Sequence, residues 1–173
     1  MTEALSQIRQ QYKPAEVQII FITEAVQPGK RFFYLKNSNV FRAIKEAFSR
    51  IFGEFKNEEE FLTFFKKNGC YVDYLGAEMI NGLPPEARQK VRTNGIKPLS
   101  EQLTLMKPKV VVTMMKVLEP EVNKAIELSA ITSVQYAKAV PFPAHSQTNV
   151  DKCIAALVEV LEELLDREII GNE

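Results

Sequence analysis

The sequence has few of the residues that build metal centres and covalent active sites. Its 173 residues include one histidine, His145, and two well-separated cysteines, Cys70 and Cys153. A structural zinc site takes four Cys or His ligands, so we expect no metal site. Each cysteine lies in an apolar segment, which indicates a buried and reduced side chain. No G-x-S-x-G elbow is present, so nothing indicates acyl transfer by a serine triad.

Glycine-rich phosphate loops and long apolar runs are also missing. Neither G-x-x-x-x-G-K-[ST] nor G-x-G-x-x-G occurs, so the sequence does not indicate NTP hydrolysis or dinucleotide redox chemistry, and we expect no cofactor. No apolar run reaches the roughly 18 residues that span a membrane. Residues 1–13 are polar and lack the features of a signal peptide. We therefore expect a cytoplasmic protein without a membrane partner.

The sequence carries no excess charge of either sign. Twenty-two basic residues balance twenty-two acidic residues, which gives no global sign of a nucleic-acid partner. A local basic surface could still be offset by an acidic C-terminal helix. The length predicts one domain, residues 1–173, and we expect a monomer.

What the sequence does contain is a regular alternation of strand and helix patterns. Short apolar runs typical of buried strands occur at 17–22, 70–75, 110–112 and 134–140. Helices are expected at 2–12, between Ser38 and Gly53, between Asn57 and Gly69, and at 85–92, 99–106, 120–128 and 150–165. The alternation predicts an α/β fold, namely a single three-layer α/β/α domain with a four-stranded parallel sheet.

Three of the expected strands end near residues that can do chemistry. Glu24 follows the first strand, Asp73 lies in the second, and the loop 141–149 with His145 follows the fourth. Parallel strands bring their carboxyl ends to one edge, where α/β proteins bind ligands. There Glu24 could position a water or stabilise positive charge on a sugar, or it could be an exposed loop residue. Asp73 could instead cap a turn, and His145 could contact a ligand or a phosphate.

Aromatic residues follow the first strand and a turn at 28–29. Phe33 and Tyr34 could belong to the core, or they could form a platform for a flat ligand. If Tyr34 is a stacking surface, it should be partly exposed at the mouth of a cleft. Asn39 opens the next helix five residues after Tyr34.

In this region the chain resembles the uracil-DNA glycosylase superfamily, especially its mismatch-specific and hypoxanthine-type branches. Residues 33–42 read F-Y-L-K-N-S-N-V-F-R, and those branches carry an aromatic residue, a short polar spacer and then N-x-F-W. Arg42 stands where the tryptophan would be. Residues 23–29, T-E-A-V-Q-P-G, are similar to the G-E-A-P-G motif of other branches, with Thr23 for the first glycine and Val26 for the proline.

The resemblance extends from about residue 15 to about residue 165 in the order of its elements. Residues 141–149, P-F-P-A-H-S-Q-T-N, are similar to the second motif of the superfamily, of the H-P-S-P or N-P-S type. Phe142 stands where several branches have a histidine. The four cysteines of the iron–sulfur branches are absent, so no cluster is expected.

The resemblance implies a DNA glycosylase that hydrolyses the N-glycosidic bond of a deaminated base, of the uracil or hypoxanthine type, in DNA. Glu24 and Asn39 are the implied catalytic residues, with a base flipped out of the duplex. Lys30, Arg31 and Lys36 are candidate cations at the rim. The predicted substrate-binding residues are Tyr34, Phe33, Asp73, His145, Ser146 and Asn149.

Two other interpretations remain open, so the residues do not decide whether the chain is an enzyme. The departures at Thr23, Val26 and Phe142 favour a non-catalytic module of the same fold that binds a base, a nucleotide or DNA. The third interpretation is a scaffold that binds a partner through its acidic C-terminal helix.

Overall fold

The computed structural model of the chain, which describes residues 2–25, 31–76 and 82–171, is built around a parallel four-stranded sheet. The strands are β1 (Ile19–Ala25), β2 (Cys70–Gly76), β3 (Val110–Thr113) and β4 (Tyr136–Ala139), in the order β2-β1-β3-β4. The predicted fold class is confirmed. The predicted turn at 28–29, Val26 and Lys30 lie outside the described residues.

The central strand β1 is longer than its apolar run predicted. The strand continues past Ile22, so Thr23 and Glu24 are strand residues rather than loop residues, and Thr23 pairs with Tyr74 of β2. Neighbouring strands on both sides of β1 supply the hydrogen bonds that extend it. The short run 110–112 pairs with β1 along its whole length, as expected of a buried strand.

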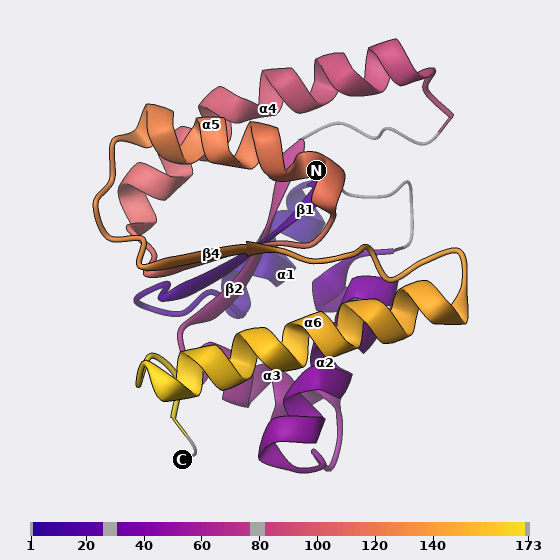
Figure 1. Ribbon diagram of the computed structural model, residues 1–173, viewed down its shortest axis with the longest axis vertical. Helices are drawn as coiled ribbons and strands as arrows, with labels where there is room; N and C mark the ends of the chain where they lie inside the picture. Colours follow the sequence, from indigo (N-terminus) through magenta and orange to yellow (C-terminus); the bar gives the residue numbers. More distant parts are fainter. Residues whose placement is uncertain (1, 26–30, 77–81, 172–173) are drawn as a thin grey trace.

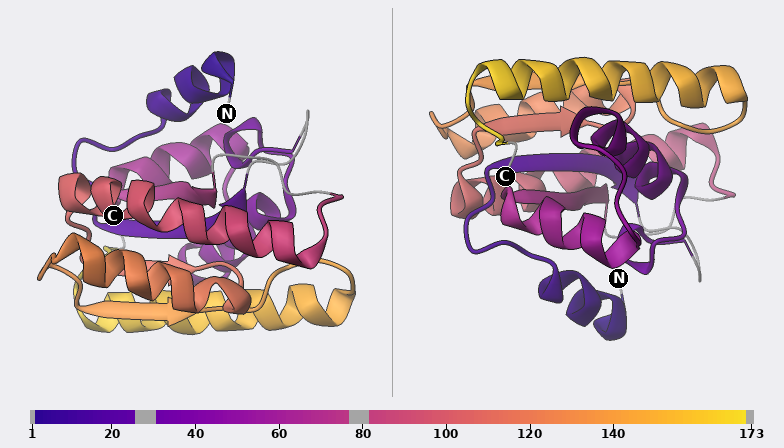
Figure 2. Two further views of the ribbon diagram at one scale, coloured as in Figure 1. Left: turned by 90° about the horizontal axis from the view of Figure 1, so that it is seen from above. Right: turned by 90° about the horizontal axis from the view of Figure 1, so that it is seen from below.

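Helices cover both faces of the sheet and produce the three layers (Figure 1). On one face lie α2 (Asn39–Phe52), α3 (Glu58–Lys67) and α6 (Gln147–Asp166), and on the other lie α4 (Pro85–Met106) and α5 (Glu119–Ser129). The short helix α1 (Glu3–Gln11) lies beside the β2 edge in both views of Figure 2. The single-turn 3₁₀ helices are η1 (Phe33–Leu35) and η2 (Lys116–Leu118).

Side-chain caps fix where the helices on one face begin. Ser38 Oγ accepts from the Phe41 N–H at 3.1 Å, and Asn57 Oδ1 accepts from the Glu60 N–H at 2.9 Å, so both predicted N-caps are confirmed. A cap satisfies a backbone donor that has no partner within the helix. The start of α2, which reaches the carboxyl edge of the sheet, is therefore set by its own sequence.

The segment predicted as two helices, 85–92 and 99–106, is one helix, α4, with Pro98 inside it. Proline removes one backbone hydrogen bond from a helix interior, which is why the sequence favoured a break. The helix continues because α4 packs along both α5 and β2, and tertiary packing outweighs local propensity. None of the helices in the described part of the chain combines the length and apolar character that a membrane span requires.

Two neighbouring strands send the chain to opposite faces of the sheet. After β1 the chain enters α2 on one face, and after β3 it enters α5 on the other (Figure 1). A crevice opens where adjacent connections diverge in this way, and ligands of α/β proteins bind there. The fold therefore places its binding position outside the carboxyl ends of β1 and β3.

We predict that Gly95→Ala strongly destabilises the protein, although alanine is normally the better helix former by about 1 kcal/mol. A Cβ at Gly95 would lie 2.0 Å from the Leu75 carbonyl oxygen, because α4 approaches β2 most closely there. Relief of that clash would have to move backbone, so we expect a loss of at least about 3 kcal/mol. Urea unfolding measures it, with the exposed neighbour Asn94→Ala as the control. Equal stability of the two variants would contradict the close approach.

Candidate functional site

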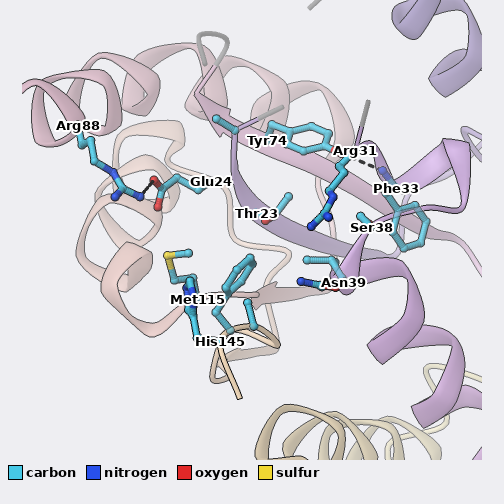
Figure 3. Close-up of a pocket in the computed structure, with 14 residues that line it drawn as sticks. Thr23, Glu24, Arg31, Phe33, Ser38, Asn39, Tyr74, Arg88, Met115 and His145 are labelled. Carbon is cyan, nitrogen blue, oxygen red and sulfur yellow. Dashed lines mark hydrogen bonds and ion pairs between the residues drawn. The ribbon is translucent and has the colours of Figure 1, made fainter. Parts of the chain in front are cut away.

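A cleft of about 500 Å³ lies at the position that the topology indicates, and its size is that of a small-molecule site (Figure 3). Strands, loops and both helical layers contribute to its wall. One side carries Glu24, Arg88, Met115 and His145, and the opposite side carries Arg31, Phe33, Ser38 and Asn39 (Figure 3). The remaining lining residues are Thr23, Ala25, Val40, Tyr74, Phe142 and Ala144.

Glu24 is almost fully buried and shares its carboxylate between two arginines of α4. Arg88 Nη2 lies 3.2 Å from Oε1 and Arg92 Nη2 lies 2.9 Å from Oε2, and the Glu24 side chain is 6% exposed. The alternative of an exposed loop glutamate is therefore wrong. Each oxygen accepts one hydrogen bond, so the two guanidinium groups neutralise Glu24 but leave one lone pair on each of its oxygens.

Asn39, the first residue of α2, has an amide whose orientation is fixed. The Arg42 guanidinium donates to Asn39 Oδ1 and also to the Asn37 carbonyl oxygen. A guanidinium has no acceptor, so its partner on Asn39 must be the amide oxygen. The amide nitrogen is left for the cleft and points into it (Figure 3). Asn39 therefore presents hydrogen-bond donors to a ligand.

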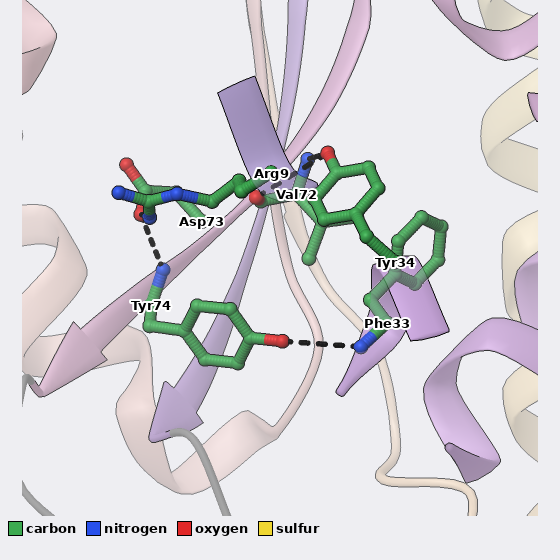
Figure 4. A network of polar contacts seen from close by, with 6 residues as sticks. All are labelled: Arg9, Phe33, Tyr34, Val72, Asp73 and Tyr74. Atoms are coloured by element: carbon green, nitrogen blue, oxygen red, sulfur yellow. Dashed lines mark hydrogen bonds and ion pairs between the residues drawn. The ribbon is translucent and has the colours of Figure 1, made fainter. Parts of the chain in front are cut away.

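Tyr34 is a core residue, and the expectation that it lies at the mouth of the cleft is wrong. Its side chain is 1% exposed, and its ring stacks on Tyr12 at 5.4 Å between centroids. The Val72 N–H donates to the Tyr34 hydroxyl at 2.8 Å, and that hydroxyl donates to the Val72 carbonyl at 3.5 Å (Figure 4). These bonds satisfy the backbone N–H and carbonyl of Val72 on the edge strand β2. Burial raises the pKa of Tyr34 well above its ordinary value.

Three aromatic residues line the cleft, Phe33, Tyr74 and Phe142, and the first two are hydrogen-bonded to each other. The Phe33 N–H donates to the Tyr74 hydroxyl at 3.3 Å, which ties η1 to the end of β2 (Figure 4). The Phe33 ring is buried against Phe41, at 5.3 Å between centroids, so it forms a rigid backing. Tyr74 is half-buried, and of the two rings it has the surface that a flat ligand can contact.

Asp73 is not part of the cleft. Side chains alternate along a strand, so Asp73 faces away from the side that Tyr74 occupies. Its carboxylate accepts from Arg9 Nη1 at 2.6 Å and from the Tyr74 N–H at 2.8 Å (Figure 4). Burial raises the pKa of Asp73, and the Arg9 guanidinium partly offsets that effect. The residue fixes α1 against β2, in a separate hollow of about 360 Å³.

The loop after β4 brings one of its three predicted residues to the cleft. His145 lines the wall with a φ of 76°, a left-handed conformation that is uncommon for a residue with a Cβ. Ser146 caps α6 by accepting from the Asn149 N–H at 3.1 Å, and Asn149 Nδ2 donates to the Ala144 carbonyl at 2.8 Å. Ser146 and Asn149 lie outside the cleft wall, where they hold the loop that presents His145.

Sequence reasoning missed Tyr74, Met115 and the arginines of α4. Arg88 and Arg92 lie four residues apart and therefore share one face of a helix. A signal was available in that spacing, since a carboxylate at the end of a buried strand needs cationic partners. Arg31, predicted as a rim cation, does line the cleft.

The cleft has an excess of positive charge within a neutral chain. Two arginines, Arg31 and Arg88, line the cleft with one carboxylate, Glu24, which Arg92 behind the wall also neutralises, so positive charge is in excess. The Arg31 side chain points into the cleft and pairs with no described residue (Figure 3). In residues 2–25, 31–76 and 82–171, no three His, Cys, Asp or Glu side chains gather as a metal-ligand set. The arrangement favours an anionic or acceptor-rich ligand.

Comparison of the sequence with protein-family models and with curated proteins finds no match. The resemblance to the uracil-DNA glycosylase superfamily therefore stays a prediction, and the argument for function depends on the cleft itself.

Because Tyr34 is buried, we predict that Tyr34→Ala costs about 3–5 kcal/mol of folding stability through the cavity it leaves. Tyr34→Phe should cost about 1–3 kcal/mol, since a buried backbone group of Val72 loses its partner. Thermal unfolding measures both, and the partly exposed neighbour Leu35→Ala should change stability by no more than about 0.5 kcal/mol. A stable Tyr34→Ala variant would place the ring at the surface.

Glu24→Gln should destabilise the protein by about 3 kcal/mol, because it leaves Arg92 as a buried charge without a counter-ion. Glu46→Gln is the matched control: Glu46 pairs with Arg50 on the exposed surface of α2, where such pairs contribute about 0.3–0.5 kcal/mol. Urea unfolding compares the two. Equal losses would mean that the Glu24 ion pairs are no stronger than a surface pair.

Proposed function

We propose that the chain is a DNA glycosylase that removes a deaminated base, of the uracil or hypoxanthine type, from DNA, and that it acts as a monomer in the cytoplasm. The observation that carries the proposal is the fixed amide of Asn39, which presents donors beside the aromatic residues Phe33 and Tyr74. A flat heterocycle that carries acceptors on its edge is the ligand complementary to this wall.

The donors of Asn39 favour a deaminated base over its parent base. Deamination replaces the exocyclic amino group of cytosine or adenine, a donor, with a carbonyl oxygen, an acceptor. A donor facing an amino group leaves both groups unpaired, and such a mismatch in a buried site costs about 1–3 kcal/mol. Since Arg42 holds the amide oxygen, Asn39 cannot turn over to accept from an amino group without losing that bond.

The positive charge of the cleft favours the departure of the base. When a glycosidic bond breaks heterolytically, the base leaves with the bonding electrons and the sugar becomes cationic. Arg31 is placed to stabilise negative charge on the leaving base. A keto base carries that charge better than an amino base, because its carbonyl oxygens delocalise it. Glu24 would support the sugar cation or hold the attacking water.

A second function, binding without cleavage, is favoured by one observation. Both carboxylate oxygens of Glu24 are paired with arginines, so the negative charge that would support a sugar cation is already neutralised. A protein that bound a base or nucleotide in this cleft without hydrolysing it would need no free carboxylate. Its signature is saturable binding of a uracil-containing oligonucleotide with no abasic product.

The test is incubation of excess protein with oligonucleotides that contain uracil, hypoxanthine or xanthine, followed by alkaline cleavage at abasic sites. We expect base release from at least one of them. Asn39→Asp keeps the size of the side chain and the bond to Arg42 but removes the donors, so base release should fall about 100-fold. Arg50→Gln, on the exposed surface of α2, is the control and should behave as the wild type.

No abasic product on any of the three substrates would overturn the glycosylase proposal. If the oligonucleotides still bind, and Asn39→Asp weakens binding, the cleft is a binding site and the second function holds. If Asn39→Asp releases bases as fast as the wild type, Asn39 does not recognise the base.

A further inference from the structure

The two arginines that share Glu24 differ in how firmly they are held. The Arg92 side chain is 13% exposed and lies 2.9 Å from Oε2, whereas the Arg88 side chain is 40% exposed and lies 3.2 Å from Oε1. Arg88 lines the cleft, and Arg92 does not. Arg92 is thus the permanent counter-ion of Glu24, and Arg88 is the partner that a ligand can reach.

Arg88 has hydrogen-bonding capacity that Glu24 does not use. A guanidinium carries five N–H donors in a planar fork, and only Nη2 of Arg88 donates to Glu24. Its Nε, like that of Arg92, is buried and makes no hydrogen bond to any group of the described residues, so a ligand would reach the exposed part of the Arg88 guanidinium. The fork matches two oxygens of a phosphate, and charge-assisted bonds of this kind are about twice as strong as neutral ones.

We propose that Arg88 recognises the phosphate of a nucleotide in the cleft and exchanges Glu24 for it. The phosphate takes the Arg88 guanidinium, Glu24 keeps Arg92, and Glu24 Oε1 loses its hydrogen bond to Arg88. The inference rests on the proposed function only in taking the ligand to be a nucleotide. The exchange also leaves Glu24 paired with one arginine instead of two.

The charges of the cleft agree with such an exchange. An anion that pairs with Arg88 relieves an excess of positive charge, and Glu24 stays neutralised by Arg92. Arg31 faces the anion from the opposite side of the cleft (Figure 3). A neutral nucleoside could not compete for Arg88, since leaving Glu24 would then cost an ion pair and return none.

The test is calorimetric titration of the full chain with deoxyuridine, deoxyuridine monophosphate and inorganic phosphate. We expect the wild type to bind the monophosphate at least about tenfold more tightly than the nucleoside, the effect of one charge-assisted contact. Inorganic phosphate should compete with the monophosphate. In Arg88→Gln the ratio of the two affinities should fall to about one, and Arg50→Gln should keep the wild-type ratio.

Equal affinities of wild type for the nucleoside and its monophosphate would overturn the proposal without any variant. An Arg88→Gln protein that unfolds at the wild-type temperature and keeps the wild-type ratio would overturn it too. Arg88→Lys adds a third measurement, because it keeps the charge but loses the fork, and the ratio should lie between those of wild type and Arg88→Gln.

The source of the phosphate is distinguished by a single-stranded oligonucleotide with one uracil, whose phosphates are diesters. The phosphate belongs to the DNA backbone if two results are found. The oligonucleotide binds the wild type more tightly than the monophosphate does, and Arg88→Gln binds the oligonucleotide no more tightly than the nucleoside. Tighter binding of the monophosphate assigns a free nucleotide. Binding that depends on Arg88 but is not followed by base release would overturn the glycosylase proposal and support this inference. Base release, together with equal affinities for the nucleoside and its monophosphate, would support the glycosylase and overturn this inference.

Discussion

A carboxylate at the end of a buried central strand has to be neutralised, and this requirement organises one side of the protein. Glu24 lies at the carboxyl end of β1 with almost no exposed surface, where an unpaired charge would be prohibitively costly. Helix α4 supplies both counter-charges, Arg88 and Arg92. The helix lies close to the sheet because Gly95 has no side chain to separate it from the backbone of β2. The burial of Glu24 therefore requires α4 to pack closely on the sheet, and the arginines that α4 brings give the cleft its positive charge.

The opposite side of the cleft depends on the hydrogen bonds that cover the edge strand β2. Strand β2 is an edge strand, and edge strands with free backbone groups promote association between chains. Tyr34 hydrogen-bonds the outward-pointing backbone groups of Val72, and the Arg9–Asp73 ion pair fixes α1 over the same edge. Holding Tyr34 there turns its neighbour Phe33 toward the cleft. The ring that stabilises the edge and the ring that lines the cleft thus belong to one turn, η1.

Much of the fold could be predicted because its signals are local. Apolar runs identified all four strands, and the caps Ser38 and Asn57 identified two helix starts. The position of the cleft could be predicted because ligands of open parallel sheets bind at the carboxyl ends of the strands. The roles of Glu24 and Tyr34 were missed, because their partners are far away in the chain and only the four-residue spacing of the arginines gave a local signal. Glu24 meets arginines 64 and 68 positions later, and Tyr34 meets Val72.

The individual groups of the cleft converge on one kind of ligand. Asn39, Arg31 and Arg88 all present donors to the space between them, and two of the three carry charge. A ligand that satisfies them must be rich in acceptors and must carry negative charge or develop it. A nucleotide with a keto base has both properties, the carbonyls on its base and the oxygens of its phosphate. In the proposed exchange this phosphate would take Arg88 and leave Glu24 paired with Arg92 alone, so binding of the ligand would also change the charge that surrounds the carboxylate.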